Sequence, residues 1–178
     1  MGAMVDAVRG NSDAMKLIDG AQVELSVTWD HDGRACKGRV DALKMIGDES
    51  DPRYIIVDLK TTQDVSPRGF ARTVANYHYH GQLAFYSDGL HSNGVQCVGH
   101  AIIAVQNSHP FDCAVYDLHD IVPQGRWQYQ QWLEKLAWCE KYDLWPGVQG
   151  DDGQLVLELP KWAETPSAWR DGEEEDWT

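Results

Sequence analysis

The sequence contains no apolar run that could cross a lipid bilayer, which takes roughly 20 residues. Its most apolar stretch, 98–105, is short and includes His100, so it predicts a buried strand. The N-terminus also lacks the basic-then-apolar pattern of a secretory signal peptide. These absences predict a cytoplasmic protein without membrane contact.

Closely spaced cysteines are also missing. The four cysteines are scattered singly, with no Cys-x-x-Cys pair, at Cys36, Cys97, Cys113 and Cys139. This argues against a zinc ribbon or an iron–sulfur cluster, and it predicts reduced thiols in the core.

Positive charge is scarce, and the formal net charge is −13. A simple nucleic-acid-binding protein is usually basic, so the charge argues against that class. However, many acidic residues lie in two local runs, 48–51 and 171–176. A metal-dependent enzyme also needs carboxylates, whose charge the bound cations offset.

The 178 residues suffice for one domain with a sizeable core. We predict a single domain over residues 1–162 and an acidic, disordered tail over 163–178. Apolar periodicity and turn residues predict helices at 5–19, 68–90 (in two pieces, after Ser66 as N-cap and Pro67) and 122–144, and strands at 22–30, 34–46, 54–60, 95–106, 112–118 and 155–159. The long last helix is amphipathic, with one face formed by Tyr129, Trp132, Leu133, Leu136 and Cys139. The order of elements predicts an α/β layered domain with a mixed sheet whose first three strands form an antiparallel meander.

Two charged residues on the third strand, Asp58 and Lys60, are two positions apart and should share one face of the sheet. Val57 and Leu59 should then point into the core. Asp41 lies on the preceding antiparallel strand, where it can come alongside Asp58. Two carboxylates and an ammonium group would meet at the edge of a buried sheet.

Carboxylate oxygens are the ligands that Mg²⁺ prefers. A bound metal makes hydroxide available near neutral pH, and a lysine can orient that water. An Asp-x-Lys pair alone, however, is more often a surface ion pair than a catalytic site. A catalytic site becomes the favoured interpretation because three motifs follow one another in the chain: Gly-Arg-Val-Asp (38–41), Ile-Val-Asp-Leu-Lys-Thr-Thr (56–62) and Tyr-His-Gly-Gln-Leu-Ala-Phe-Tyr (79–86).

With these motifs the sequence resembles the PD-(D/E)XK nuclease superfamily, and within it the RecE-type exonucleases of phages and prophages. The resemblance runs from about Glu24 to Trp162 and includes Trp145-Pro146 and the closing Leu-Pro-Lys-Trp-Ala. It implies a restriction-endonuclease-like three-layer domain with an αβββαβ core.

The resemblance also implies roles for individual residues. The aspartates that match Asp41 and Asp58 bind metal, Leu59 belongs to the same metal-binding set, and the lysine that matches Lys60 acts on the water. The residues that match Gln82 and Tyr86 line the active site. These two are one helical turn apart and so share a face. A core role for Tyr86 is about as plausible from the sequence as contact with DNA.

Further candidates for DNA contact are Arg39, Thr61, Thr62 and His80. Each has an ordinary alternative as a solvated strand cation, a strand end or a local structural residue. Glu24 is either a third acidic ligand or a polar strand residue. We predict no role for His78, because residues two apart on a helix face different ways.

One departure from the family concerns an upstream helix, where RecE-type enzymes carry a histidine metal ligand. No histidine precedes His31 here. We therefore expect either a core without the N-terminal helical part or a metal ligand that is replaced or dispensable.

The resemblance implies Mg²⁺ as cofactor, with Mn²⁺ as a substitute, and double-stranded DNA with a free end as substrate. It also implies a ring-like homo-oligomer, a single-strand annealing protein as partner, and a bacterial or phage-infected cytoplasm.

The first hypothesis is a 5′ to 3′ exonuclease that generates single strands for recombination. An endonuclease of the same fold, in repair or defence, is the second. The third is a non-catalytic module that binds DNA or a partner.

Overall fold

The computed structural model describes residues 2–148, 155–158 and 160. The chain forms two compact units, residues 1–137 and 138–178. The sheet and its covering helices all belong to the first unit. The predicted single domain over 1–162 remains a prediction.

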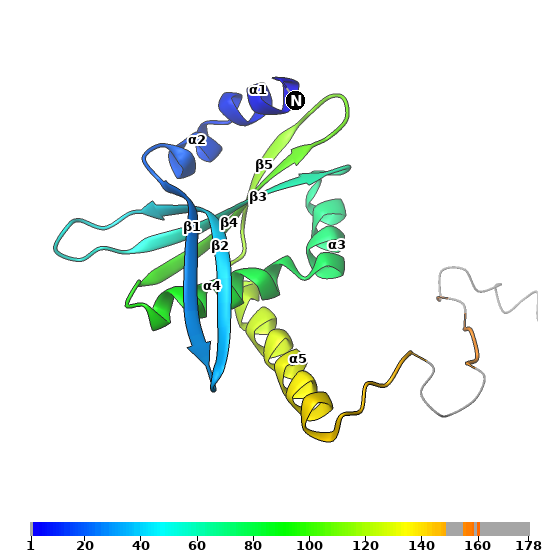
Figure 1. The fold of residues 1–178 in the computed structure, drawn as a ribbon. Coiled ribbons are helices and arrows are strands. Elements are labelled where there is room, and N and C mark those ends of the chain that lie inside the picture. Colours follow the sequence, from blue (N-terminus) through cyan, green and yellow to red (C-terminus); the bar gives the residue numbers. More distant parts are fainter. Residues whose placement is uncertain (1, 149–154, 159, 161–178) are drawn as a thin grey trace, which may run out of the picture. The chain divides into compact units, whose positions relative to one another are not determined.

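A five-stranded mixed sheet organises the first unit, with the strand order β1-β2-β3-β4-β5 (Figure 1). Strands β1, β2 and β3 form the predicted antiparallel meander, β4 runs parallel to β3, and β5 is antiparallel to β4. Their bounds are Gln22–His31, Arg34–Met45, Tyr54–Thr62, Cys97–Gln106 and Cys113–Asp117. The predicted α/β class and mixed sheet are thus confirmed.

Local sequence explains the strands. The β1–β2 turn uses Asp32 and Gly33, at φ 53° and 81°, and positive φ at both central residues is what a tight hairpin turn needs. In β4, residues 101–105 are all buried, because helices cover both faces of this inner strand. The β1–β2 hairpin is thus partly exposed, whereas β4 forms the buried centre of the sheet.

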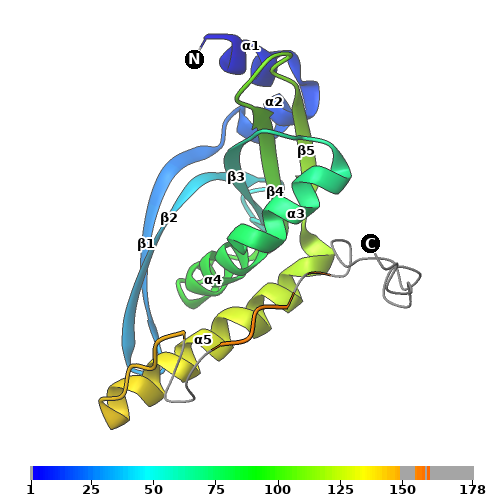
Figure 2. The same ribbon diagram turned by 90° about the vertical axis from the view of Figure 1, so that its right-hand side faces the viewer.

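One face of the sheet carries α3 (Pro67–Tyr77) and α4 (Tyr79–Ser92), as Figure 2 shows. The Ser66 side chain accepts a hydrogen bond from the Gly69 amide at 3.2 Å, and Pro67 occupies the first helical position. His78, in a left-handed conformation (φ 56°, ψ 36°), separates the two helices. The predicted helical segment in two pieces is therefore confirmed. The larger core lies under these helices and includes Phe70, Leu83, Ile56 and Ile102.

The other face carries two short helices, α1 (Gly2–Gly10) and α2 (Ser12–Ile18). One continuous helix over 5–19 was therefore wrong. Asn11 interrupts it, because its side chain accepts from the amides of Asp13 and Ala14 as an N-cap. The Asn11 amide also donates to the Cys113 carbonyl at 3.0 Å, which ties the helices to β5.

After β5 come a 3₁₀ turn, η1 (His119–Ile121), and the long α5 (Val122–Tyr142). On the predicted face of α5, Tyr129 and Cys139 are buried, but Trp132 is 46% exposed. The predicted strand at 155–159 is wrong for 155–158, which have no regular structure, and residue 159 lies outside the described residues. The predicted tail, 163–178, lies outside them too.

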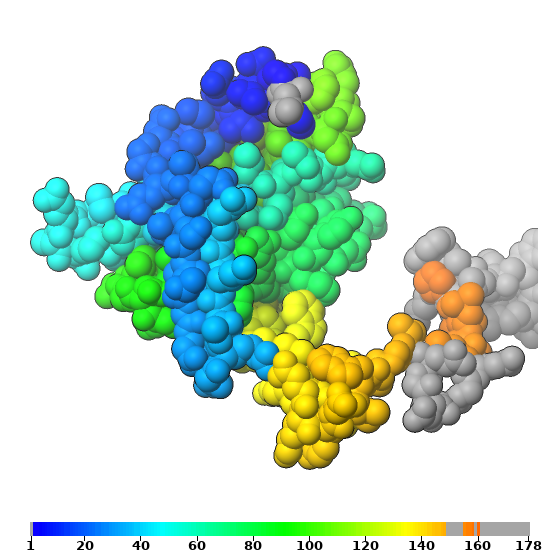
Figure 3. Space-filling view, in the orientation of Figure 1, coloured from blue at the N-terminus to red at the C-terminus, as the bar shows by residue number. Residues whose placement is uncertain are grey.

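The β2–β3 loop, which contains the acidic run 48–51, stands out from the body of the first unit (cyan in Figures 1 and 3). Asp48 closes its turn by accepting from the Ser50 and Asp51 amides at 2.9 and 3.0 Å. Part of the negative charge is thus carried on an exposed loop.

Two further features bear on the class of protein. Within the described parts of the chain, no helix is long and apolar enough to cross a membrane. All four cysteines are free thiols, but the predicted core position holds only for Cys139, since the other three are partly exposed. Burial raises the pKa of Cys97 to about 11.

Candidate active site

The two aspartates meet where strands β2 and β3 separate. Their pairing runs from Met45 opposite Tyr54 to Ala42 opposite Val57, and Asp41 and Asp58 are the next residues. Beyond this point an Asp41 carboxylate oxygen accepts the Leu59 amide proton at 2.9 Å, in place of a strand-to-strand hydrogen bond. The end of the pairing therefore sets the two carboxylates side by side.

Asp58 is a buried carboxylate, with only 2% of its surface exposed. Its Oδ2 lies 2.7 Å from the Lys60 ammonium, and apart from this ion pair no hydrogen-bond donor among the described residues reaches that atom. Burial raises the pKa of Asp58 to about 6, Lys60 opposes the rise, and Asp41 adds to it. Asp58 therefore sits where its negative charge is costly and a bound cation would relieve the cost.

Lys60 is held from three sides. Besides Asp58, it donates to the Gln82 side-chain oxygen at 3.2 Å, and its Nζ lies 4.7 Å from the centre of the Tyr79 ring. The Gln82 amide donates in turn to the Tyr86 hydroxyl at 3.3 Å. Tyr79, Gln82 and Tyr86 are three and four residues apart on α4, so one helix face presents all of them to β3.

Two of these supporting residues were missed in the sequence. Tyr79 lay inside a recognised motif without a role, although its spacing from Gln82 placed it on the same face. Gly38 makes room for Tyr86, since a Cβ at this position would lie 2.7 Å from the tyrosine Cε1. A glycine inside a predicted strand often marks the close approach of another group, so its place in the strand 34–46 was a signal that could have found it.

A divalent cation fits the paired carboxylates of Asp41 and Asp58. The fit rests on the Asp58 oxygen that no donor satisfies and on the mutual proximity of the two groups. Mg²⁺ is commonly held by only one or two carboxylates while it keeps several waters. In the part of the chain that the structure describes, no group of three or more Asp, Glu, His or Cys side chains could hold a metal.

Leu59 does not point into the core as expected; it is 49% exposed. Val57, on the same side of β3, belongs to the smaller core under α1 and α2, and this core does not include Leu59. Helices α1 and α2 therefore cover β3 at Val57 but not at Leu59.

Of the other predicted DNA-contact residues, Thr61 and Thr62 directly follow Lys60 on β3. Arg39 makes an exposed ion pair with Glu24 at 2.9 Å. The buried Thr62 hydroxyl donates to the Asp64 carbonyl at 3.2 Å, whereas Thr61 is exposed. His80 lies against α5, where burial lowers its pKa.

His78 has a structural role, contrary to the prediction from the sequence. Besides separating the two helices, its Nδ1 lies 3.1 Å from the Gln128 side-chain oxygen on α5. Its ring meets the Trp132 ring edge-on, with centroids 4.8 Å apart. The prediction of no role assumed that His78 lies within a helix, and it does not.

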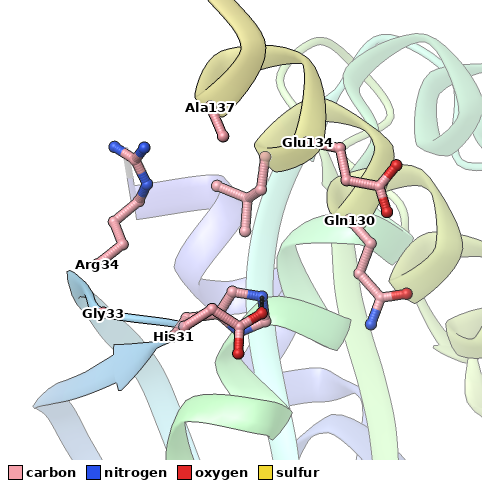
Figure 4. Close-up of a pocket in the computed structure, with 8 residues that line it drawn as sticks. His31, Gly33, Arg34, Gln130, Glu134 and Ala137 are labelled. Atoms are coloured by element: carbon pink, nitrogen blue, oxygen red, sulfur yellow. Dashed lines mark ion pairs between the residues drawn. The ribbon is translucent and has the colours of Figure 1, made fainter. Parts of the chain in front are cut away.

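A hollow of about 640 Å³ between the β1–β2 turn and α5 shares no residue with the Asp58–Lys60 pair. Figure 4 shows His31 and Arg34 on its strand side and Gln130, Glu134 and Ala137 on its helix side. The chemistry expected of paired carboxylates and a lysine is therefore located elsewhere, at the β2–β3 junction.

Comparison with known proteins identifies the fold. Residues 1–152 match the family described as "PDDEXK-like domain of unknown function (DUF3799)". No curated protein matches. The crystal structure of a protein from Eubacterium rectale, titled "Putative exonuclease", is 13% identical and superimposes with a TM-score of 0.61. The match covers 90% of this chain but only 62% of that one. A second structure, of SSO0001, covers 61% of this chain and 46% of its own at 18% identity, and its TM-score of 0.37 is too low to carry an argument.

Proposed function

Because the chain belongs to the family of PDDEXK-like domains, we propose that it is a metal-dependent deoxyribonuclease that hydrolyses DNA at Asp41, Asp58 and Lys60. The observation that carries the proposal is the buried Asp58 carboxylate, 2.7 Å from the Lys60 ammonium and beside Asp41. An ordinary surface ion pair is exposed to solvent on both sides. Here the side chains are only 3% and 18% exposed.

Lys60 is positioned to act on the reacting groups. Its ammonium can orient an attacking water or offset the charge that develops on the phosphoryl oxygens. Gln82 and the Tyr79 ring restrict where the flexible lysine side chain can place that charge. Tyr86 holds Gln82 in turn through a hydrogen bond. Residues of α4 therefore position the charged groups that β3 carries.

Asp41 and Asp58 would hold the divalent cation, and Leu59 can add only its main-chain carbonyl. Bound there, Mg²⁺ or Mn²⁺ would supply a hydroxide near neutral pH and stabilise the charge of the displacement. Asp58 must be ionised to bind a cation. Its raised pKa therefore makes cation binding weaken as the pH falls below about 6.

We propose duplex DNA with a free end as the substrate. Two lines support exonuclease action: the resemblance to RecE-type enzymes and the name given to the Eubacterium rectale protein. The 5′ to 3′ polarity, the ring-like oligomer, the role in recombination and the annealing partner rest on the resemblance alone.

The test compares end-labelled linear duplex with closed circular duplex, with Mg²⁺ and with EDTA. We expect metal-dependent release of nucleotides from linear DNA only, and losses of at least about 100-fold in Lys60→Ala and Asp58→Asn. Lys16→Ala is the matched control, since this lysine lies on α2 with a 74% exposed side chain.

Full activity in Lys60→Ala would refute the assignment. Digestion of the closed circle would instead indicate an endonuclease. The non-catalytic alternative gains some support from the absence of a histidine before His31, where RecE-type enzymes carry a metal ligand. It predicts no cleavage with any metal. It also predicts that a calorimetric titration with Mn²⁺ detects no binding site that is lost in Asp41→Ala.

A further inference from the structure

A pocket of about 340 Å³ opens beside the Lys60 site, and we call it the aromatic pocket. Its walls include Tyr77, His78, Gln82, Phe85, Trp132 and Leu133. Gln82 is shared with the candidate active site, where its side-chain oxygen lies 3.2 Å from Lys60 Nζ. The aromatic pocket is therefore one side chain away from the proposed reaction centre.

The walls expose flat aromatic surface. Tyr77 and Trp132 are 69% and 46% exposed, although both are large aromatic residues. His78 meets Trp132 edge-on at an interplanar angle of 77°, and Gln128 fixes the His78 ring from behind. These contacts hold the Trp132 indole beside the opening of the pocket. A patch of exposed apolar surface commonly marks a binding site.

The charge of the aromatic pocket differs from that of the protein as a whole. The net charge is −13, yet none of the described residues that line this pocket is Asp, Glu, Lys or Arg. An uncharged nucleobase would therefore meet neutral walls there. The polar group that the pocket does contain, the Gln82 carboxamide, can pair with the edge of a base.

A polar hollow of about 550 Å³ adjoins the aromatic pocket across the Tyr77 ring, which lines both. Tyr77 and Tyr79 stack there with ring centroids 5.7 Å apart and planes 16° from parallel. The polar side offers Thr61, Arg72 and Asn107, and it also contains one carboxylate, Asp64, whose charge the nearby Arg72 opposes. An apolar slot and a polar hollow on either side of a tyrosine suit the two halves of a nucleotide.

We propose that the aromatic pocket binds one unpaired nucleobase at the end of a DNA strand, stacked against Trp132 and Tyr77. The inference rests on the proposed nuclease function, because the strand must pass Lys60 to place its base there. It deepens that function, since a terminal nucleotide that is already unpaired becomes the preferred substrate. Paired bases are stacked inside a duplex and do not reach such a pocket.

The test uses the full chain in EDTA at low salt, with a hairpin duplex whose unpaired terminal base is 2-aminopurine. We expect its fluorescence to be quenched on binding, because the base stacks on an aromatic ring. Stacking of one base contributes about 1–3 kcal/mol, so Trp132→Ala should weaken binding by about 5- to 150-fold. Trp127→Ala is the matched control, because Trp127 lies on the same helix, is 65% exposed and does not line the aromatic pocket.

A second comparison does not depend on a variant. Replacing the terminal base by an abasic site should weaken binding to the wild-type protein to a similar degree. In Trp132→Ala the same replacement should have little further effect, because the two changes remove one interaction.

Three outcomes would overturn the proposal: equal binding of base and abasic ends by the wild-type protein, equal losses in Trp127→Ala and Trp132→Ala, or no DNA binding. Dissociation of a dimer by Trp132→Ala in sedimentation would also overturn it, since a second copy would then occupy the pocket. These results are separable from the nuclease assignment. Metal-dependent cleavage that requires Lys60 can stand without base discrimination, and base binding in EDTA can stand without cleavage.

Discussion

Replacement of Asp58 by asparagine is expected to stabilise the metal-free protein at neutral pH while it abolishes cleavage. The folded protein raises the pKa of this carboxyl from its ordinary 3.8 to about 6, chiefly through burial. At 1.36 kcal/mol for each pH unit between these values, the ionised carboxylate lowers the free energy of unfolding by about 3 kcal/mol. Asparagine has the same shape without the charge, so up to that amount should be recovered.

The pH dependence gives this prediction its sign. Between pH 3.8 and about 6 the folded protein holds a proton on Asp58 that the unfolded chain has lost, so stability falls as the pH rises through this range. The advantage of Asp58→Asn should therefore be near zero below pH 3.8 and complete above pH 6. Urea unfolding in EDTA at pH 4 and pH 7.5 measures both ends.

Asp88 provides a control of opposite sign. Burial acts to raise its pKa, but hydrogen bonds from Arg126 and Tyr129 outweigh burial and lower it. Asp88→Asn should therefore destabilise the protein at pH 7.5, since it breaks the paired Arg126 contacts of 2.7 to 3.0 Å. If both variants lost stability at pH 7.5, or if the Asp58→Asn difference did not change with pH, the account of Asp58 would be refuted.

Three further predictions concern other parts of the first unit. Gly38→Ala places a Cβ 2.7 Å from Tyr86 and should cost about 1–3 kcal/mol of stability and lower single-turnover cleavage, whereas unchanged melting and rates would contradict this contact. Burial lowers the pKa of His100 to about 4, so the unfolded chain binds the extra proton, and the contribution of His100 to stability should fall by about 3 kcal/mol as the pH drops from 6.5 to 4. Asp58 acts with the opposite sign over much of this range, so the effect is measured at each pH as the difference in urea stability between the protein and His100→Leu. Asn11→Ala removes both an N-cap and the tie to Cys113, and a loss of about 1 kcal/mol or more in urea unfolding is expected; a loss below a few tenths would contradict it.

The sequence was sufficient for the five strands of the sheet, although it also suggested a sixth at 155–159, and for the central pair of the candidate site. Asp58 and Lys60 share a face because strand geometry has a period of two, and Ser66-Pro67 starts a helix for reasons local to those residues. The Gln82–Tyr86 contact likewise follows from helical spacing. Each of these features depends on residues close together in the chain.

The features that were missed depend on contacts between distant segments. Leu59 is exposed because the helices that cover Val57 stop short of it, and neither α1 nor α2 reveals its reach in the sequence. Gly38 is required by a tyrosine 48 positions later. The cap at Asn11 is local, and asparagine is a preferred N-cap residue, so the sequence could have shown it; its bond to the Cys113 carbonyl, in contrast, joins distant segments.

The order in which the strands join has a consequence for the kinetics of folding. Asp58 becomes enclosed only when β3 meets its parallel partner β4, and two helices separate these strands in the chain. Such distant pairings form late, because the entropy of loop closure is lost before the new contacts can stabilise the chain. We therefore expect the cost of burying Asp58 to be incurred after the rate-limiting step. Its protonation, or the binding of a cation, should then slow unfolding and leave the refolding rate nearly unchanged.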